Sequence, residues 1–265
     1  FSVNNVCLGN AVTFSNNSLP GSGSSLSYTW SANFYTFATI QNPSYTFTNS
    51  GIYQVELTAV SDLGCINKKN SSVVIYDLPV VNYTVNNPCL NSPATFTNLT
   101  SIATGSVVKW RWDFENDGTW DDSTNYHPSK LYPGSGPVIC NLQAISNNQC
   151  VSVTSKTIVV RALPVADFRK SSSKPVCLND EVKFTNLSTC SDGSITAYWW
   201  DFNNDAVQDN GEMNPTYSFS VTGLIPVKHS VMSQYGCTAT KISNMYLNVK
   251  AVPFFTSDKQ QGCPP

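Results

Sequence analysis

Three segments of the sequence repeat one pattern: VCLGNAVTFSN at Val6–Asn16, PCLNSPATFTN at Pro88–Asn98 and VCLNDEVKFTN at Val176–Asn186. Their cysteines, at positions 7, 89 and 177, are followed by a second series at 65, 150 and 237. The segments YDLPVV, RALPVA and KAVPFF recur in the same register. Because independent features share one period, the sequence predicts an array of similar domains. We expect module 1 at 1–78, module 2 at 79–163, module 3 at 164–252 and the start of a fourth at 253–265.

Apolar residues alternate with polar ones within each module, as in strands with one buried face. One predicted strand recurs in all three modules. Its alternating positions are Tyr53, Val55, Leu57 and Ala59 in module 1; Val138, Cys140, Leu142 and Ala144 in module 2; and Ile225, Val227, His229 and Val231 in module 3. A second strand carries the aromatics Tyr28 and Trp30; Trp110, Trp112 and Phe114; and Tyr198, Trp200 and Phe202. About seven short strands per module predict an immunoglobulin-like sandwich. We therefore expect an all-β chain of three tandem β-sandwich domains in an elongated array, with stiff proline linkers.

Composition excludes several functions. The 265 residues carry 15 Lys+Arg against 17 Asp+Glu, so no basic field is present to hold nucleic acid. The sequence contains no uninterrupted run of 18 apolar residues, so we expect no membrane insertion. The chain begins FSVNNVCLGN, with neither a Met nor a signal peptide, so we expect a monomeric fragment or processed product of a longer chain. Nine cysteines favour an oxidising, extracellular setting.

Trp112-Asp113-Phe114 and Trp200-Asp201-Phe202 resemble the WDFGDG signature of PKD domains. NPSYTF from Asn42 and NPTYSF from Asn214 resemble the NPxHxY segment of that family, whereas module 2 has HPSKLY from His127. Module 1 departs further, because Trp30-Ser31-Ala32 lacks the aspartate. With the added cysteine elements, the array resembles those of very large surface proteins of Bacteroidetes, among them the SprB-type gliding adhesins. The resemblance implies β-sandwich modules without catalysis, with roles in spacing, adhesion or glycan contact.

Catalytic residues are not expected. The sequence has two histidines: the strand alternation points His229 inward, and His127 precedes Pro128 in a turn. Neither belongs to a recognisable nucleophile–base motif, and no metalloprotease or phosphate-binding motif occurs. We therefore predict that the chain is not an enzyme.

Acidic turns are the one constellation that could hold a ligand, and calcium is the cofactor they suggest. The turn of module 3 has acidic or amide side chains at positions 1, 3, 5, 9 and 12 of a calcium loop. The turn of module 2 is a partial copy, because Thr124 stands at position 12, where the loop has a carboxylate. The alternative is a polar turn whose side chains bond the backbone. Module 1 has no such acids. The candidate ligands are Asp201, Asn203, Asp205, Asp209 and Glu212 in module 3, and Asp113, Glu115, Asp117 and Asp121 in module 2.

The cysteines allow more than one pairing. Even spacing favours one disulfide per module: Cys7–Cys65, Cys89–Cys150 and Cys177–Cys237. This pairing requires the first strand to deviate, because the turns next to the two cysteines lie at opposite ends of an immunoglobulin topology. The rival pairs each second cysteine with the first cysteine of the next module. We expect Cys140 and Cys190 to be free, and Cys263 to be the first cysteine of a fourth module.

Two functions remain. The first is a non-catalytic stalk or adhesion segment of a large secreted or cell-surface protein, a bacterial adhesin that could serve gliding motility, with surface glycans or proteins as partners. The second is a carbohydrate-contacting accessory module of a secreted hydrolase, in which Trp199 and Trp120 would stack on sugars.

Overall fold

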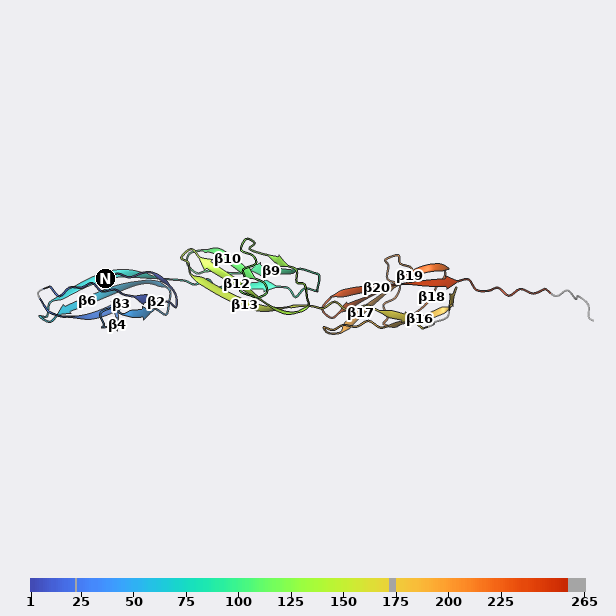
Figure 1. Ribbon diagram of the computed structural model, residues 1–265, viewed down its shortest axis with the longest axis horizontal. Helices are drawn as coiled ribbons and strands as arrows, with labels where there is room; N and C mark the ends of the chain where they lie inside the picture. Colours follow the sequence, from blue (N-terminus) through green and yellow to red (C-terminus); the bar gives the residue numbers. More distant parts are fainter. Residues whose placement is uncertain (22, 172–174, 257–265) are drawn as a thin grey trace, which may run out of the picture. The chain divides into compact units, whose positions relative to one another are not determined.

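The computed structural model describes residues 1–21, 23–171 and 175–256, and every regular element in these ranges is a β-strand (Figure 1). The all-β prediction is therefore confirmed. Within these ranges no helix has the length and hydrophobicity to cross a membrane. The described chain divides into two compact units, one of Phe1–Asn86, Ala94–Lys130 and Pro137–Ile158, and one of Asn87–Pro93, Leu131–Gly136 and the residues from Val159.

Module 1 is a sandwich of two sheets (Figure 1). Strand β1 pairs with β7 in parallel, whereas the other pairings are antiparallel. The five-stranded sheet has the order β1 (Val6–Cys7), β7 (Ile66–Tyr76), β6 (Gly51–Ser61), β3 (Leu26–Ala32) and β4 (Tyr35–Ala38), and the second sheet pairs β2 (Ala11–Thr13) with β5 (Ser44–Thr46).

Module 2 repeats this plan with two three-stranded sheets. An isolated parallel bridge between Cys89 and Arg161 replaces the β1–β7 pair. The sheets have the orders β10 (Val107–Asp113), β12 (Gly136–Ser146), β13 (Val151–Val160), and β11 (Ser129–Lys130), β9 (Ala94–Asn98), β8 (Tyr83–Val85).

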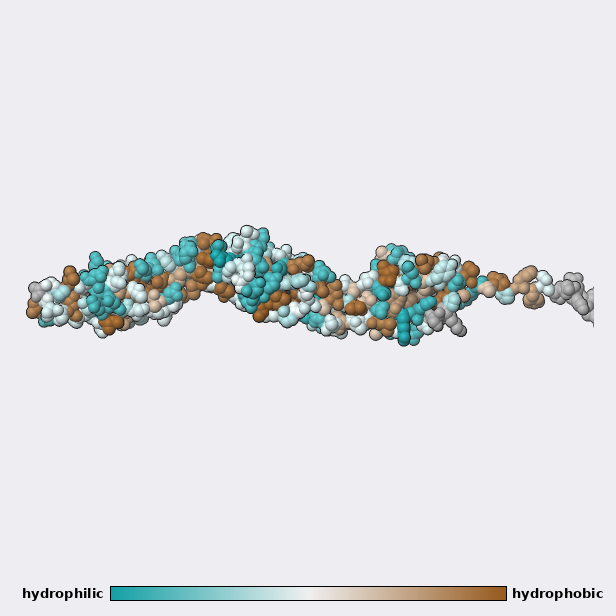
Figure 2. Space-filling model, in the orientation of Figure 1, coloured by the Kyte–Doolittle hydropathy of each residue, from teal (hydrophilic) through white to brown (hydrophobic). Residues whose placement is uncertain are grey.

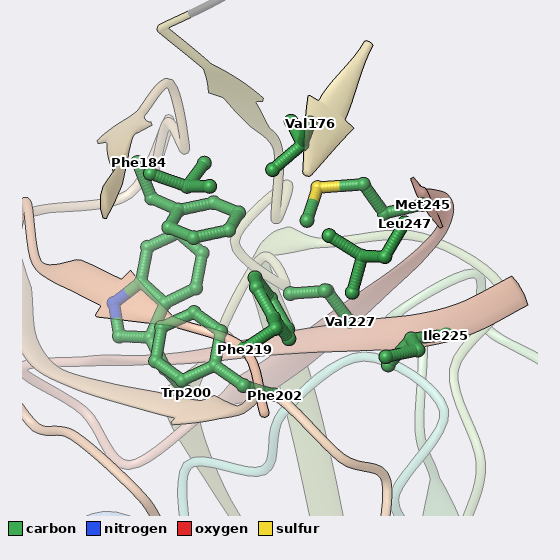
Figure 3. Close-up of a cluster of buried hydrophobic side chains, with 10 residues drawn as sticks. Val176, Phe184, Trp200, Phe202, Phe219, Ile225, Val227, Met245 and Leu247 are labelled. Atoms are coloured by element: carbon green, nitrogen blue, oxygen red, sulfur yellow. The ribbon is translucent and has the colours of Figure 1, made fainter. Parts of the chain in front are cut away.

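Module 3 again pairs its first cysteine strand, β15, in parallel with its last strand, β20. The sheets have the orders β15 (Val176–Cys177), β20 (Thr238–Asn248), β19 (Gly223–Ser233), β17 (Ile195–Asp201), and β14 (Phe168–Lys170), β16 (Glu181–Asn186), β18 (Thr216–Ser218). Side chains of both sheets meet in the core drawn in Figure 3, where Phe184 and Phe202 lie beside Trp200.

The central tryptophans Trp30, Trp112 and Trp200 are each 0% exposed, as their strand alternation predicts. The aromatics two residues earlier, Trp110 and Tyr198, are only half-buried. Each buried tryptophan removes roughly 200 Å² of apolar surface from water, which stabilises its module by about 5 kcal/mol. Outside the cores, hydrophobic and hydrophilic residues are interspersed on the face in Figure 2.

A clamp between two loops explains the NP segments. In each module the residue before the proline accepts a hydrogen bond from the backbone N–H of a buried asparagine. An imidazole nitrogen replaces the amide oxygen in module 2, so the departure of that module from the NP pattern preserves the bond. The acceptor–donor pairs are Asn42–Asn16 at 2.8 Å, His127–Asn98 at 3.1 Å and Asn214–Asn186 at 2.9 Å.

Candidate functional site

The acidic turn of module 3 begins where β17 ends at Asp201. The Oδ2 atom of this buried carboxylate accepts the N–H of Ala206 at 3.0 Å, and Asp209 Oδ2 accepts the N–H of Phe202 at 2.6 Å. Ala206 adopts φ +69°, the left-handed conformation that a glycine supplies in the calcium loop. Two of the predicted ligands therefore hold the turn together. The other oxygen of Asp201, Oδ1, is buried and has no hydrogen-bond partner among the described residues.

The outer part of the same turn is held by its own side chains. Asn203 Nδ2 donates to Asp205 Oδ2 at 3.0 Å, and Asp205 Oδ1 accepts the N–H of Val207 at 2.8 Å. Glu212 contributes its backbone carbonyl, which accepts the indole N–H of Trp200 at 2.9 Å. Two of these bonds, at Val207 and Glu212, join a side chain to the backbone, as in a polar turn.

Module 2 has an equivalent turn. Asp113, only 2% exposed, accepts the N–H groups of Asp117 and Gly118 at 3.2 Å each, and the amide of Asn141 at 3.2 Å. Burial opposes ionisation of Asp113, but these hydrogen bonds outweigh it and hold its pKa below the usual value. Phe114 donates its N–H to Asp121 at 2.7 Å, as Phe202 does to Asp209.

Two predicted ligands of module 2 lie on the outside of that turn. Glu115 forms an ion pair with Lys130 of β11 at 2.6 Å, and Asp117 accepts the N–H of Thr119 at 2.7 Å. The described residues contain no group of three or more His, Cys, Asp or Glu placed to hold a metal ion. Calcium binding is a prediction, and the turn of module 3 offers it a buried carboxylate oxygen, Asp201 Oδ1.

Module 1 replaces the acidic turn with a tight hairpin. Asn33 and Phe34, at φ 46° and 75°, join β3 to β4, and two consecutive positive φ values are typical of a type I′ turn. Asn33 Oδ1 also accepts the N–H of Gln54 at 3.0 Å. This hairpin is fixed without carboxylates, as the missing acids indicate.

Both histidines have structural partners. His229 is 0% exposed, stacks on Trp200 with ring centroids 3.8 Å apart and lies 3.0 Å from Asn186 Oδ1 through Nε2. Burial lowers the pKa of His229 to about 4. The predicted inward orientation is therefore confirmed, and the imidazole is neutral at pH 7.

The cysteines pair between modules. The disulfides are Cys7–Cys150 and Cys89–Cys237, with Cα–Cα distances of 5.6 Å in both. The predicted pairing within modules, Cys7–Cys65, Cys89–Cys150 and Cys177–Cys237, is wrong. The predicted rival is also wrong in direction, because the first cysteine of one module pairs with the second cysteine of the next.

Strand geometry excludes the pairing within a module. Cys7 pairs with Tyr76 at the end of β7, whereas Cys65 immediately precedes the start of the same strand. The eleven residue steps from 65 to 76 span about 36 Å at roughly 3.3 Å each. A disulfide requires Cα atoms within about 7 Å. The same interval separates 150 from 161 and 237 from 248, beside Cys89 and Cys177.

The remaining cysteines described in the structure are free: Cys65, Cys140, Cys177 and Cys190. This confirms the free thiols expected at 140 and 190. Burial raises the pKa of Cys140 to about 12, so this thiol is unreactive. Cys263 lies outside the described residues.

Each disulfide is accompanied by a polar contact that sequence analysis missed. Asp77, after the last strand of module 1, accepts a hydrogen bond from the hydroxyl of Thr104 in module 2. Arg161 pairs with Asp192 of module 3 at 3.3 Å and lies over the ring of Tyr235 at 3.6 Å. The sequence signal for these contacts was a charged residue shortly before the linker proline, Asp77 before Pro79 and Arg161 before Pro164, in a chain with few charges.

The two candidate glycan-stacking residues, Trp199 and Trp120, are half-buried. Trp199 lines a shallow hollow of about 350 Å³ together with Lys228 and Thr240. Trp200 also lines this hollow, and an indole beside polar groups is suited to a sugar ring.

The chain is similar to known PKD domains in sequence. Residues 2–75 match the model of the PKD domain family. The PKD1 domain of Vibrio anguillarum Epp is 30% identical, with 33% of this chain and 96% of that chain covered and a TM-score of 0.29. The PKD1 domain from the Vibrio cholerae metalloprotease PrtV is also 30% identical, over 32% and 98%, with a TM-score of 0.28. Three N-terminal domains of the bacteriophage RB49 Hoc protein are 12% identical over 95% and 100%, with a TM-score of 0.48.

Proposed function

This chain belongs to the PKD domain family, and from that premise we propose that it is a non-catalytic stalk or adhesion segment of a large secreted or cell-surface protein. A bacterial adhesin, with gliding motility as one setting, is the parent that fits best. The polar residues that could serve chemistry support this proposal, since His229 and Asp113 are engaged in core and turn contacts. Disulfides support an extracellular location.

The observation that carries the proposal is the covalent connection between consecutive modules. Force entering module 2 through Cys150 reaches β13 at its first residue, and β13 ends beside Cys89. There Leu90 donates its N–H to the carbonyl of Arg161 at 2.7 Å, and Cys89 passes the force to module 3. The two linkers that join modules 1 to 2 and 2 to 3 are thereby each bypassed by a disulfide. A segment whose function is to transmit tension has a use for such a bypass.

Single-molecule stretching of the oxidised and reduced chain tests this proposal. Reduced and unfolded, the chain between positions 7 and 237 extends to about 830 Å at roughly 3.6 Å per residue. Oxidised, the shortest covalent path runs through positions 150 to 89 and extends to about 220 Å. Equal extensions in the two states would remove the mechanical basis of the stalk.

A second candidate function is an accessory module that contacts carbohydrate. It is favoured by the hollow at Trp199, where an indole lies beside Lys228 and Thr240. A glycan array probed with the wild-type chain and with Trp199→Ala tests it. Binding that the substitution abolishes would support this function, and an array without signal would eliminate it.

We also propose calcium as a ligand of the module 3 turn. The support is Asp201 Oδ1, a buried carboxylate oxygen without a partner, beside a turn that carries Asp205 and Asp209. Calcium prefers carboxylate and carbonyl oxygens. Binding would require the outer carboxylates to turn away from their backbone bonds toward Asp201.

A further inference from the structure

Of the four free cysteines described, two, Cys65 and Cys177, occupy the positions that form disulfides in the other modules. Cys65 belongs to the series of Cys150 and Cys237, and Cys177 to the series of Cys7 and Cys89. We propose that each is a docking point for a further PKD-type module, which bonds to it in the register of the two disulfides. This inference rests on the proposed stalk function and deepens it by naming the partner at each end.

Cys65 is held in the same turn as its bonded counterparts. In all three turns the cysteine N–H donates to a serine hydroxyl four residues earlier, and the residue before the cysteine has a positive φ. The φ values are 80° at Gly64, 61° at Gln149 and 81° at Gly236. The geometry needed for bonding is therefore already present at Cys65.

Cys65 differs from its bonded counterparts in being uncovered. Cys150 and Cys237 are 0% and 1% exposed, whereas Cys65 is exposed. Leu63, which stands two residues before Cys65 as Tyr235 stands before Cys237, is 66% exposed. Tyr235, which is 43% exposed, packs under Arg161 of the preceding module. Leu63 and its exposed neighbour Ile66 thus form an apolar end that a preceding module would cover, in continuity with the junctions already present.

Cys177 is prepared in the same way at the other end. The residue after it, Leu178, donates its N–H to the carbonyl of Asn248 at 2.8 Å, which fixes Cys177 beside the end of β20. Leu8 and Leu90 make the same bond at 2.9 and 2.7 Å, next to the bonded Cys7 and Cys89.

Bond formation needs a disulfide oxidant such as oxidised glutathione. One thiolate attacks glutathione disulfide and releases one glutathione. The second thiolate then attacks the mixed disulfide and releases the other, so two thiols are oxidised and one glutathione disulfide is reduced.

A duplicated chain tests the proposal directly. Joining residue 256 to Phe1 of a second full copy places that phenylalanine four residues after Pro253, as Tyr83 follows Pro79 and Phe168 follows Pro164. In a glutathione redox buffer we expect a Cys177–Cys65 disulfide between the copies, identified by peptide mapping without reduction. Cys65→Ser in the second copy should leave Cys177 open to alkylation, and Cys190→Ser, which removes a free thiol outside the register, should change nothing.

The outcomes separate clearly. The proposal would be overturned if Cys177 of the first copy and Cys65 of the second copy were recovered as free thiols while the disulfides of Cys7 and Cys89 had formed. Disulfides that join Cys177 to Cys190 as often as to Cys65 would also overturn the proposal. In the single 265-residue chain, alkylation should label Cys65 and Cys177 and spare the four bonded cysteines. Stretching of the single chain tests the stalk independently, so failure of either proposal is recognisable.

Discussion

Removing one disulfide should destabilise the module that follows it, and Cys89→Ala is the sharpest case. Cys89 is held beside Arg161 by two backbone bonds of 2.7 Å, from Leu90 to the carbonyl of Arg161 and from Arg161 to the carbonyl of Pro88. When module 3 unfolds with the Cys89–Cys237 bond intact, the closed loop therefore runs from position 161 to 237. Loss of the bond frees those 76 residue steps in the unfolded state.

The chain-entropy relation gives the size of the effect. A loop of that length corresponds to about 15 cal/mol/K, or roughly 4.5 kcal/mol at 25 °C. For a domain of this size, that should lower the melting temperature of module 3 by about 20 °C. In the wild type the disulfide stabilises the folded state by restricting the unfolded chain, so the core contacts of module 3 need not change.

Hydrogen exchange resolved by peptide provides the assay. Amides in the middle of β19 and β20 should exchange about 10³-fold faster in Cys89→Ala than in wild type, since exchange from the unfolded module follows its stability. Cys190→Ser is the matched control, because it removes a cysteine that forms no disulfide. Exchange within fivefold of wild type in Cys89→Ala would refute the loop argument.

Three further predictions follow from single groups. The folded-state pKa of His229, about 4, lies below the unfolded value of 6.5, so the unfolded state binds more protons between these values and module 3 should lose about 3 kcal/mol as pH falls from 6.5 to 4. His229→Leu, matching Leu57 and Leu142, should flatten that pH dependence in urea titrations, and an unchanged slope would contradict it. Asp113→Ala should cost module 2 about 2–3 kcal/mol in thermal unfolding, because it removes the acceptor of two backbone N–H groups and one amide in the turn; a loss below 1 kcal/mol would contradict the turn assignment. Calcium should raise the melting temperature of module 3 in wild type but not in Asp201→Asn, and equal curves in calcium and EDTA would exclude the site.

The sandwich core could be predicted from local patterning, because each buried position obeys a strand period of two. Trp30, Trp112 and Trp200 follow that pattern, and so does His229. The prediction fails for Trp110 and Tyr198, which share the buried face but are only half-buried. Alternation gives the face of a side chain, whereas the depth depends on where the opposite sheet ends.

The acidic turns show a different limit. The spacing of Asp113 and Asp201 is compatible with a calcium loop and with a hydrogen-bonded turn, since both need oxygens that converge on a small volume. Spacing does not give the direction of the backbone N–H groups, which here point at the carboxylates. That direction depends on φ at Ala206 and Asn116, both positive, and neither alanine nor asparagine specifies it alone.

Cysteine pairing could not be obtained from spacing, because equal intervals along the chain do not say which end of a sandwich each cysteine occupies. The parallel pairing of Cys7 with Tyr76 is the missing fact, and it joins residues 69 positions apart. Once it is known, the two series lie at opposite ends of every module and can meet only across a junction. The direction follows too: the last strand runs from the second cysteine toward the linker, so the first cysteine lies beside the next module's hairpin turn. An array of this kind always has one fewer disulfide than modules and one open cysteine of each series. The three modules match this rule, with two disulfides and with Cys65 and Cys177 open.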